Sequence, residues 1–131
     1  MVVPARLLLV EENETSRHSL ARLLEMDGYH VEVAATIKEA LEVAARVPVD
    51  VMLSDVLLPD GDGLDLMRTL SDRYDVKGVA ISGFGDILDI ENCHKAGFVA
   101  HLFKPVTLDM VESALEIAER YVISDSGAKS R

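Results

Sequence analysis

Five short apolar runs, separated by amphipathic stretches, constrain the fold of this chain more than any other feature. The runs cover residues 7–10, 31–34, 51–54, 78–82 and 100–103. Continuous apolar runs are typical of strands that are buried on both faces, and strands that alternate with helices form a parallel sheet. The sequence therefore predicts an α/β domain in which helices cover both faces of a parallel sheet.

The amphipathic stretches predict the helices. Helical spacing of apolar residues covers 16–26, 63–73, 87–96 and the segment from 107 to about 122. The second helix follows Thr36, which forms a capping box with Glu39, and its inward stripe extends to Ala44. We expect residues 1–124 to form one domain and residues 125–131, where the helical pattern fades, to be a disordered tail.

The charge of the chain argues against some classes of partner. Its 13 Lys and Arg residues against 23 Asp and Glu residues give a formal net charge of −10, which repels nucleic acid and anionic membrane surfaces. No apolar stretch approaches the roughly 20 residues of a membrane span, and the N-terminus lacks the apolar core of a signal peptide. We expect a cytoplasmic protein that does not bind DNA or membrane directly.

Cysteine and histidine give no sign of a transition-metal site. Cys93 is the only cysteine, which excludes an intramolecular disulfide, and it falls within the predicted fourth helix. The histidines are His18, His30, His94 and His101, and they lack the i, i+4 spacing of a zinc site. A metal site in this chain would therefore use oxygen ligands.

Polar residues gather where the predicted strands end. Glu11 and Glu12 follow the first strand, Asp55 follows the third, Ser82 ends the fourth and Lys104 follows the fifth. The carboxyl ends of parallel strands meet at one edge of the sheet, where ligands bind in this class of fold. Three carboxylates placed together repel one another unless a divalent cation binds among them, and hard oxygen ligands suit Mg²⁺. This edge is therefore a candidate magnesium site.

The order and spacing of these residues resemble the response regulator receiver family. The motifs are the acidic pair, Asp-x-x-x-Pro-x-x-x-Gly from Asp55 to Gly63, the hydroxyl residue Ser82, and Lys104-Pro105. The resemblance covers residues 5 to about 123. It implies a flavodoxin-like doubly wound sheet of five parallel strands in the order 2-1-3-4-5, with five flanking helices.

The resemblance also implies a phosphorelay function. Asp55 would accept a phosphoryl group from a phosphohistidine on a histidine kinase or histidine phosphotransfer protein. Glu11, Glu12, Asp55 and the main-chain carbonyl of Leu57 would hold Mg²⁺. Such a domain is not an enzyme beyond slow self-dephosphorylation, which the apolar Leu57 and Phe84 beside the site would keep slow.

The remaining family positions imply a switch. Ser82 and Lys104 would contact phosphoryl oxygens, and His101 stands where the family commonly has a rotating Tyr or Phe. In the family the movement that follows phosphorylation is relayed to the face formed by the fourth helix, fifth strand and fifth helix. Here that face includes residues 87–96, His101 and residues 107–121. That face would bind partners or form a homodimer.

Departures from the family pattern keep alternatives open. Glu11-Glu12 stands where at least one Asp is usual, and each side chain is one methylene longer, a reach of roughly 1.5 Å. One alternative is a phosphorylation-independent pseudo-receiver. Another is a small magnesium-dependent phosphohydrolase, although Leu57 replaces the second carboxylate of its Asp-x-Asp pattern. The 58–67 segment and the segment from Gly97 to Pro105 are most similar to receivers of hybrid sensor histidine kinases.

Overall fold

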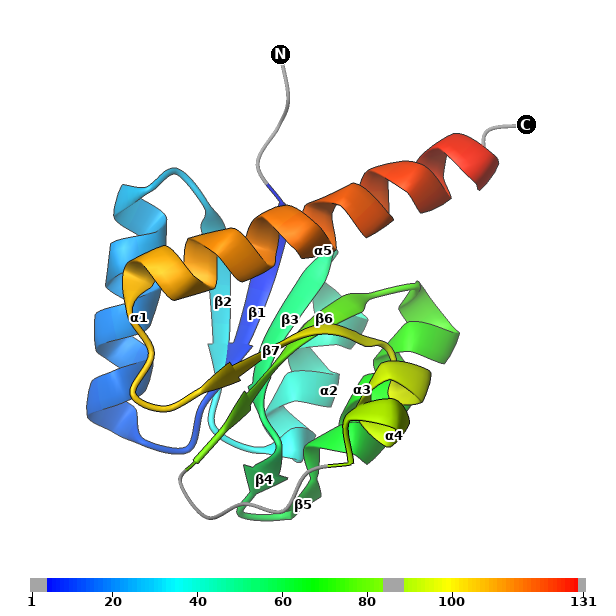
Figure 1. Cartoon of the computed structure of the whole chain (residues 1–131). Helices are drawn as coiled ribbons and strands as arrows, with labels where there is room; N and C mark the ends of the chain where they lie inside the picture. The colour runs from blue at the N-terminus through cyan, green and yellow to red at the C-terminus, as the bar shows by residue number, and fades with distance from the viewer. Residues whose placement is uncertain (1–4, 84–88, 130–131) are drawn as a thin grey trace.

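The computed structural model of the chain describes residues 5–83 and 89–129, and a five-stranded parallel sheet forms its centre (Figure 1). The strands of this sheet are β1 (Arg6–Val10), β2 (His30–Ala34), β3 (Val51–Asp55), β6 (Lys77–Ser82) and β7 (Phe98–Phe103). Their order is β2-β1-β3-β6-β7, and every neighbouring pair is parallel. This confirms the predicted arrangement, in which the first strand lies between the second and the third.

Helices cover both faces of the sheet, as predicted. They are α1 (Glu14–Met26), α2 (Ile37–Arg46), α3 (Gly63–Tyr74), α4 (Ile90–Ala96) and α5 (Leu108–Lys129). Figure 1 shows α1 and α5 on one face of the sheet, and α2, α3 and α4 on the other. In the parts of the chain that the structure describes, no helix is long and apolar enough to cross a membrane.

The sheet separates two apolar clusters because successive strand residues point to opposite faces. In β1, Leu7 and Leu9 belong to the cluster under α1 and α5, whereas Leu8 and Val10 belong to the cluster under α2, α3 and α4. All four side chains are almost completely buried. Each buried aliphatic side chain stabilises the fold by roughly 1.5–3 kcal/mol relative to an exposed one. The two clusters hold the strands rigidly, so residues at the strand ends have defined positions.

Side-chain caps explain where the first two helices begin. Asn13 Oδ1 accepts a hydrogen bond from the amide of Ser16 at 2.9 Å, and Thr36 Oγ1 accepts one from the amide of Glu39 at 3.1 Å. The Glu39 carboxylate accepts in turn from the amide of Ala35 at 2.7 Å. These bonds satisfy amides that have no partner within the helix. The predicted cap at Thr36 is confirmed, with Glu39 reaching Ala35 rather than the amide of Thr36 itself.

The segment after Asp55 contains a short hairpin that the sequence does not predict. Strands β4 (Leu57–Leu58) and β5 (Gly61–Asp62) pair in antiparallel fashion. Gly61 has a φ of +151°, a backbone conformation that glycine adopts without the steric cost other residues incur. Two paired residues on each side are too few to produce a periodic pattern, so the sequence carries no strand signal here.

Two helix boundaries correct the sequence prediction. Helix α4 begins at Ile90 because Asp89 caps it, accepting a hydrogen bond from the amide of Asn92 at 3.1 Å; the predicted start at 87 lies outside the described residues. Helix α5 continues to Lys129, so residues 125–129 are helical and not part of a disordered tail. Once a helix has formed, each further residue that is ordered adds one backbone hydrogen bond. The helix can therefore continue beyond the last residue of the apolar pattern.

Candidate functional site

A cleft of about 540 Å³ opens at the carboxyl edge of the sheet. Its walls come from the loop after β1, the end of β3 with the hairpin that follows, and the ends of β6 and β7. The lining residues are Glu11, Glu12, Asn13, Glu14, Asp55, Leu57, Ile81, Gly83 and Lys104. The topology therefore brings the predicted acidic pair, Asp55 and Lys104 to one place, although they are far apart in the sequence.

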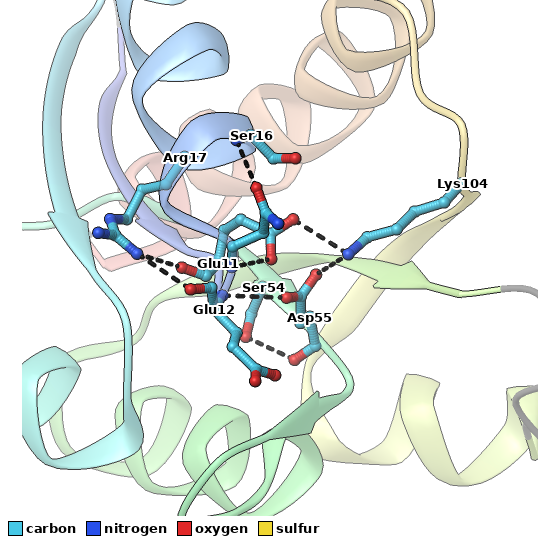
Figure 2. Close-up of polar contacts among 8 residues, drawn as sticks. Glu11, Glu12, Ser16, Arg17, Ser54, Asp55 and Lys104 are labelled. Carbon is cyan, nitrogen blue, oxygen red and sulfur yellow. Dashed lines mark hydrogen bonds and ion pairs between the residues drawn. The ribbon is translucent and has the colours of Figure 1, made fainter.

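Asp55 is the last residue of β3 and the centre of the contacts in this cleft (Figure 2). Lys104 Nζ lies 3.2 Å from Asp55 Oδ1 and 3.0 Å from Glu11 Oε1. Asp55 Oδ2 accepts a hydrogen bond from the amide of Glu12 at 3.3 Å. Asp55 Oδ1 is buried and accepts no well-aligned hydrogen bond within the described part of the chain. The Asp55 carboxylate thus has one oxygen held by the backbone and one that pairs with Lys104.

Burial and crowding change the proton affinity of these groups. Burial, followed by the hydrogen bond and charge of Glu11, raises the pKa of Asp55 to about 7, against a lowering effect of Lys104. Burial also acts to raise the pKa of Glu11, but hydrogen bonds with Asp55, Asn13 and Lys104 outweigh it and lower that pKa. Two carboxyl groups so close cannot both ionise freely. One cation, Lys104, is insufficient to balance them, so the cleft favours a second positive charge.

The backbone around Asp55 is fixed by close packing. The amide of Gly63 donates to the Val56 carbonyl at 2.6 Å, and a Cβ on Gly63 would overlap the carbonyl oxygen of Asp55. Ser54 Oγ donates to the same Asp55 carbonyl at 2.8 Å. Only glycine allows this approach, which is why the Asp55-to-Gly63 spacing matters for the position of the carboxylate.

The oxygen groups in the cleft fit Mg²⁺ with one change from the prediction. The Glu11 and Asp55 carboxylates lie beside each other, and Leu57 lines the same cleft. Figure 2 shows the Glu12 carboxylate pointing away from Lys104, and in residues 5–83 and 89–129 no three acidic, histidine or cysteine side chains are grouped to hold a metal. Mg²⁺ commonly uses one or two carboxylates and keeps several waters. Glu11 and Asp55 therefore fit this ion, and Glu12 is not grouped with them.

Ser82 and His101 lie on the same face of the sheet, in diagonal positions on the neighbouring strands β6 and β7. His101 pairs with Ala80, two residues before Ser82 on β6, and residues two apart on a strand point to the same face. Ser82 Oγ and His101 Nε2 are both buried without a hydrogen-bond partner among the described residues. Burial lowers the pKa of His101. Unlike Asp55 and Lys104, Ser82 does not line the cleft.

The structure adds two polar residues that sequence reasoning missed. Arg17 Nη1 donates to the main-chain carbonyls of Glu11 at 2.9 Å and Glu12 at 3.3 Å. Asp60 accepts hydrogen bonds from the amides of Ile37 at 2.8 Å and Lys38 at 3.1 Å, at the start of α2. These backbone contacts leave no spacing pattern of their own. The only sequence signal is an arginine in the first helix after the acidic pair and an acidic residue after Pro59.

Leu57 and Phe84, the two apolar residues predicted beside the site, bear on the phosphohydrolase alternative. The Leu57 side chain is 61% exposed at the cleft, where a phosphohydrolase would need a second carboxylate. Phe84, the other residue predicted to flank the site, lies outside the described residues. No group at Leu57 can act as an acid or base, so the arrangement suits modification of Asp55 better than repeated turnover.

Known proteins resemble this chain over most of its length. The family model described as response regulator receiver domain matches residues 7–116. The transcriptional regulatory protein FixJ of Rhizobium meliloti is 30% identical over 117 residues, which cover 88% of this chain and 57% of FixJ. The photosynthetic apparatus regulatory protein RegA of Rhodovulum sulfidophilum is 34% identical over 110 residues, 83% of this chain and 60% of RegA.

A solved structure supports the same comparison. The crystal structure of FixJ-N superposes with a TM-score of 0.80 at 29% identity and covers 91% of this chain and 96% of that one. The chain spans little more than half the length of the two curated relatives named above. The similarity therefore concerns one domain, the part of those regulators that this chain matches.

Proposed function

Because the chain belongs to the response regulator receiver family of two-component systems, we propose that it accepts a phosphoryl group on Asp55 and changes its protein contacts in response. The observation that carries the proposal is the state of the Asp55 carboxylate. It is buried at the end of β3, with Oδ1 directed at Lys104 and without an aligned hydrogen bond. A carboxylate held in this way at the edge of the cleft can act as a nucleophile.

The reaction is an in-line displacement at phosphorus. An Asp55 oxygen forms the new bond to phosphorus while the bond from phosphorus to the imidazole nitrogen of phosphohistidine breaks, and that nitrogen keeps the electron pair. Burial favours the protonated carboxyl, so the nucleophilic form requires positive charge nearby. Lys104 supplies one such charge and stays close enough to pair with a phosphoryl oxygen. Bound Mg²⁺, held by Glu11 and Asp55 and by the carbonyl of Leu57, would screen the remaining negative charge.

Ser82 is proposed to sense the product. Phosphorylation adds about −1.5 to −2 of charge and three acceptor oxygens, and the buried Ser82 hydroxyl has no other partner in the described structure. Its rotation toward the phosphoryl group would change the packing beside His101 on the neighbouring strand. The unpartnered Ser82 hydroxyl and its place on the same face as His101 support the predicted switch role of these two residues.

The switch would act on other proteins through the face of α4, β7 and α5. Exposed apolar residues are present there: Ile90, Phe103, Ile117 and Tyr121. We propose a histidine kinase or histidine phosphotransfer protein as phosphoryl donor and a second copy of the chain as a partner for this face. The expected readout is dimer formation in sedimentation velocity after addition of beryllium fluoride and Mg²⁺, and a monomer under both conditions would contradict it. The whole protein is proposed to be either a longer regulator, like the relatives, or a hybrid sensor kinase.

One observation favours a second function. The Glu12 carboxylate points away from Lys104 and is not grouped with those of Glu11 and Asp55 in the described residues, which leaves fewer metal ligands than the sequence predicts. A pseudo-receiver that acts only by protein contacts would have this feature. It differs from the first proposal in requiring no modification of Asp55.

Mass spectrometry after treatment with acetyl phosphate distinguishes the two. We expect the wild type to gain one phosphoryl group in the presence of Mg²⁺ and much less in its absence, without continued release of phosphate. Asp55→Asn should gain none. Asp72→Asn is a matched control, because it removes the same charge from an exposed position on α3. A wild type that stays unlabelled with Mg²⁺ would refute phosphorylation at Asp55 and favour the pseudo-receiver.

A further inference from the structure

We propose that Arg17 is a positioning residue that orients Asp55 for phosphoryl transfer through a single peptide group. The inference rests on the proposed function, because it concerns how Asp55 is held for that reaction. Arg17 does not touch Asp55. Its guanidinium bonds the backbone of the acidic loop, and that backbone bonds the Asp55 carboxylate.

The contacts meet on the peptide between Glu11 and Glu12. Arg17 Nη1 donates to the carbonyl oxygen of this peptide at 2.9 Å. The amide of the same peptide, on Glu12, donates to Asp55 Oδ2 at 3.3 Å. In a planar trans peptide the carbonyl and the amide point in opposite directions. A group that fixes the oxygen therefore also fixes the direction of the amide.

Figure 2 shows this arrangement, with Arg17 and Lys104 approaching the loop from opposite sides. Arg17 Nη1 also lies 3.3 Å from the Glu12 carbonyl, so one nitrogen spans two successive carbonyls. The guanidinium is planar and always charged, and its donors are pre-oriented. Such a group restricts rotation of the peptide more than a water molecule in the same place would.

The peptide fixes the orientation of the Asp55 carboxylate. Oδ2 is held by the Glu12 amide, whereas Oδ1 has no aligned hydrogen bond and faces Lys104. With Oδ2 held by the peptide and Oδ1 beside Lys104, the Asp55 carboxylate has one defined orientation at the edge of the cleft. If the peptide rotates, the carboxylate loses this hydrogen bond and both of its oxygens sample several directions. Misplacement of a reacting group by about 1 Å can slow a reaction by roughly 10²-fold.

The two possible roles of Arg17, positioning and charge, predict opposite effects of its removal on the rate of labelling, which makes the proposal testable. A positive charge beside an acidic site opposes cation binding because it weakens the negative potential that attracts Mg²⁺. If Arg17 acted only through its charge, its removal would strengthen Mg²⁺ binding and speed labelling at limiting Mg²⁺. If Arg17 orients the peptide, its removal slows labelling even when Mg²⁺ is saturating.

The experiment compares Arg17→Gln, Arg17→Lys and Arg22→Gln with the wild type. Arg22 is a matched control on the same helix: it is exposed, and its substitution makes the same charge change. The rate of labelling by acetyl phosphate is measured at saturating Mg²⁺, together with the NMR shift of the Glu12 amide proton before any phosphodonor is added. Thermal unfolding of each variant identifies any loss of folded protein.

We expect Arg17→Gln to be labelled about tenfold more slowly and its Glu12 amide proton to move upfield as the bond to Asp55 weakens. Arg17→Lys should recover part of both effects, and Arg22→Gln should change neither. Labelling of Arg17→Gln at the wild-type rate, or an unmoved Glu12 amide, would overturn the inference while leaving phosphorylation of Asp55 intact. A wild type that is not labelled would overturn the proposed function and this inference with it.

Discussion

Gly63→Ala should damage both the stability and the chemistry of the site, because the added methyl group meets backbone and not a movable side chain. A Cβ at residue 63 would overlap the carbonyl oxygen of Asp55 and lie 2.9 Å from the Val56 carbonyl oxygen and 3.1 Å from the Val56 Cα. The segment that would have to move includes the last residue of β3, which is paired with its neighbour β6 on one side. Relief of the overlap must therefore displace the main chain at Asp55.

The size of the effect follows from the cost of overpacking. Extra methyl groups in a well-packed site cost roughly 1–3 kcal/mol when the backbone must shift. We expect a loss of this size in the free energy of unfolding, measured by urea denaturation of Gly63→Ala against the wild type. Because the shift begins at Asp55, we also expect labelling by acetyl phosphate to slow by about tenfold or more at saturating Mg²⁺.

Gly28→Ala provides the control. Gly28 has a φ of +98°, and a Cβ there would meet nothing within 4 Å. Alanine at this residue is destabilised by backbone strain alone, by roughly 1–2 kcal/mol, in a turn between α1 and β2. The two variants should lose similar stability, and only Gly63→Ala should lose labelling. Equal labelling rates in the two variants, or a Gly63→Ala protein as stable as the wild type, would refute the reasoning.

Three further predictions concern other parts of the structure. Asp60→Ala should remove the acceptor for the first amides of α2, so hydrogen exchange at Ile37 and Lys38 should become faster while exchange in α5 is unchanged; equal protection in both proteins would contradict this. His101 has a lowered pKa because of burial, so the unfolded chain takes up its proton first and the folded state loses stability as the pH falls below about 6.5. In urea denaturation, the free energy of unfolding of His101→Phe should fall less between pH 7.5 and pH 5.5 than that of the wild type. An equal fall in the two proteins would show that His101 does not contribute. Leu70→Ala should reduce the free energy of unfolding by roughly 2–5 kcal/mol, since this side chain is fully buried under the sheet, and a loss below about 1 kcal/mol would mean that the site collapses around the smaller residue.

Much of the fold is readable from local patterns. The apolar runs predict the five main strands because a strand buried on both faces must be apolar along its length. Asp55 stands out for the same reason, as a charged residue where such a run ends. The strand order came from the resemblance of the motifs to a known family and not from periodicity. The hairpin at Leu57–Leu58 and the length of α5 escaped prediction because neither depends on a repeated apolar pattern.

The direction of side chains and backbone groups in the site was decided by the tertiary structure. The sequence alone places Glu11, Glu12, Asp55 and Lys104 at one edge. Because Glu11 and Glu12 are the same residue type, it does not tell which of their carboxylates lies beside Asp55. Packing of the β1–α1 loop turns Glu11 toward Lys104 and Glu12 away, and it sets the peptide between them so that Arg17 and Asp55 bind its two ends. The contacts of Glu12 with Asp55 and of Glu11 with Lys104 join residues far apart in the chain. Their geometry depends on how the strands are stacked, which no local pattern encodes.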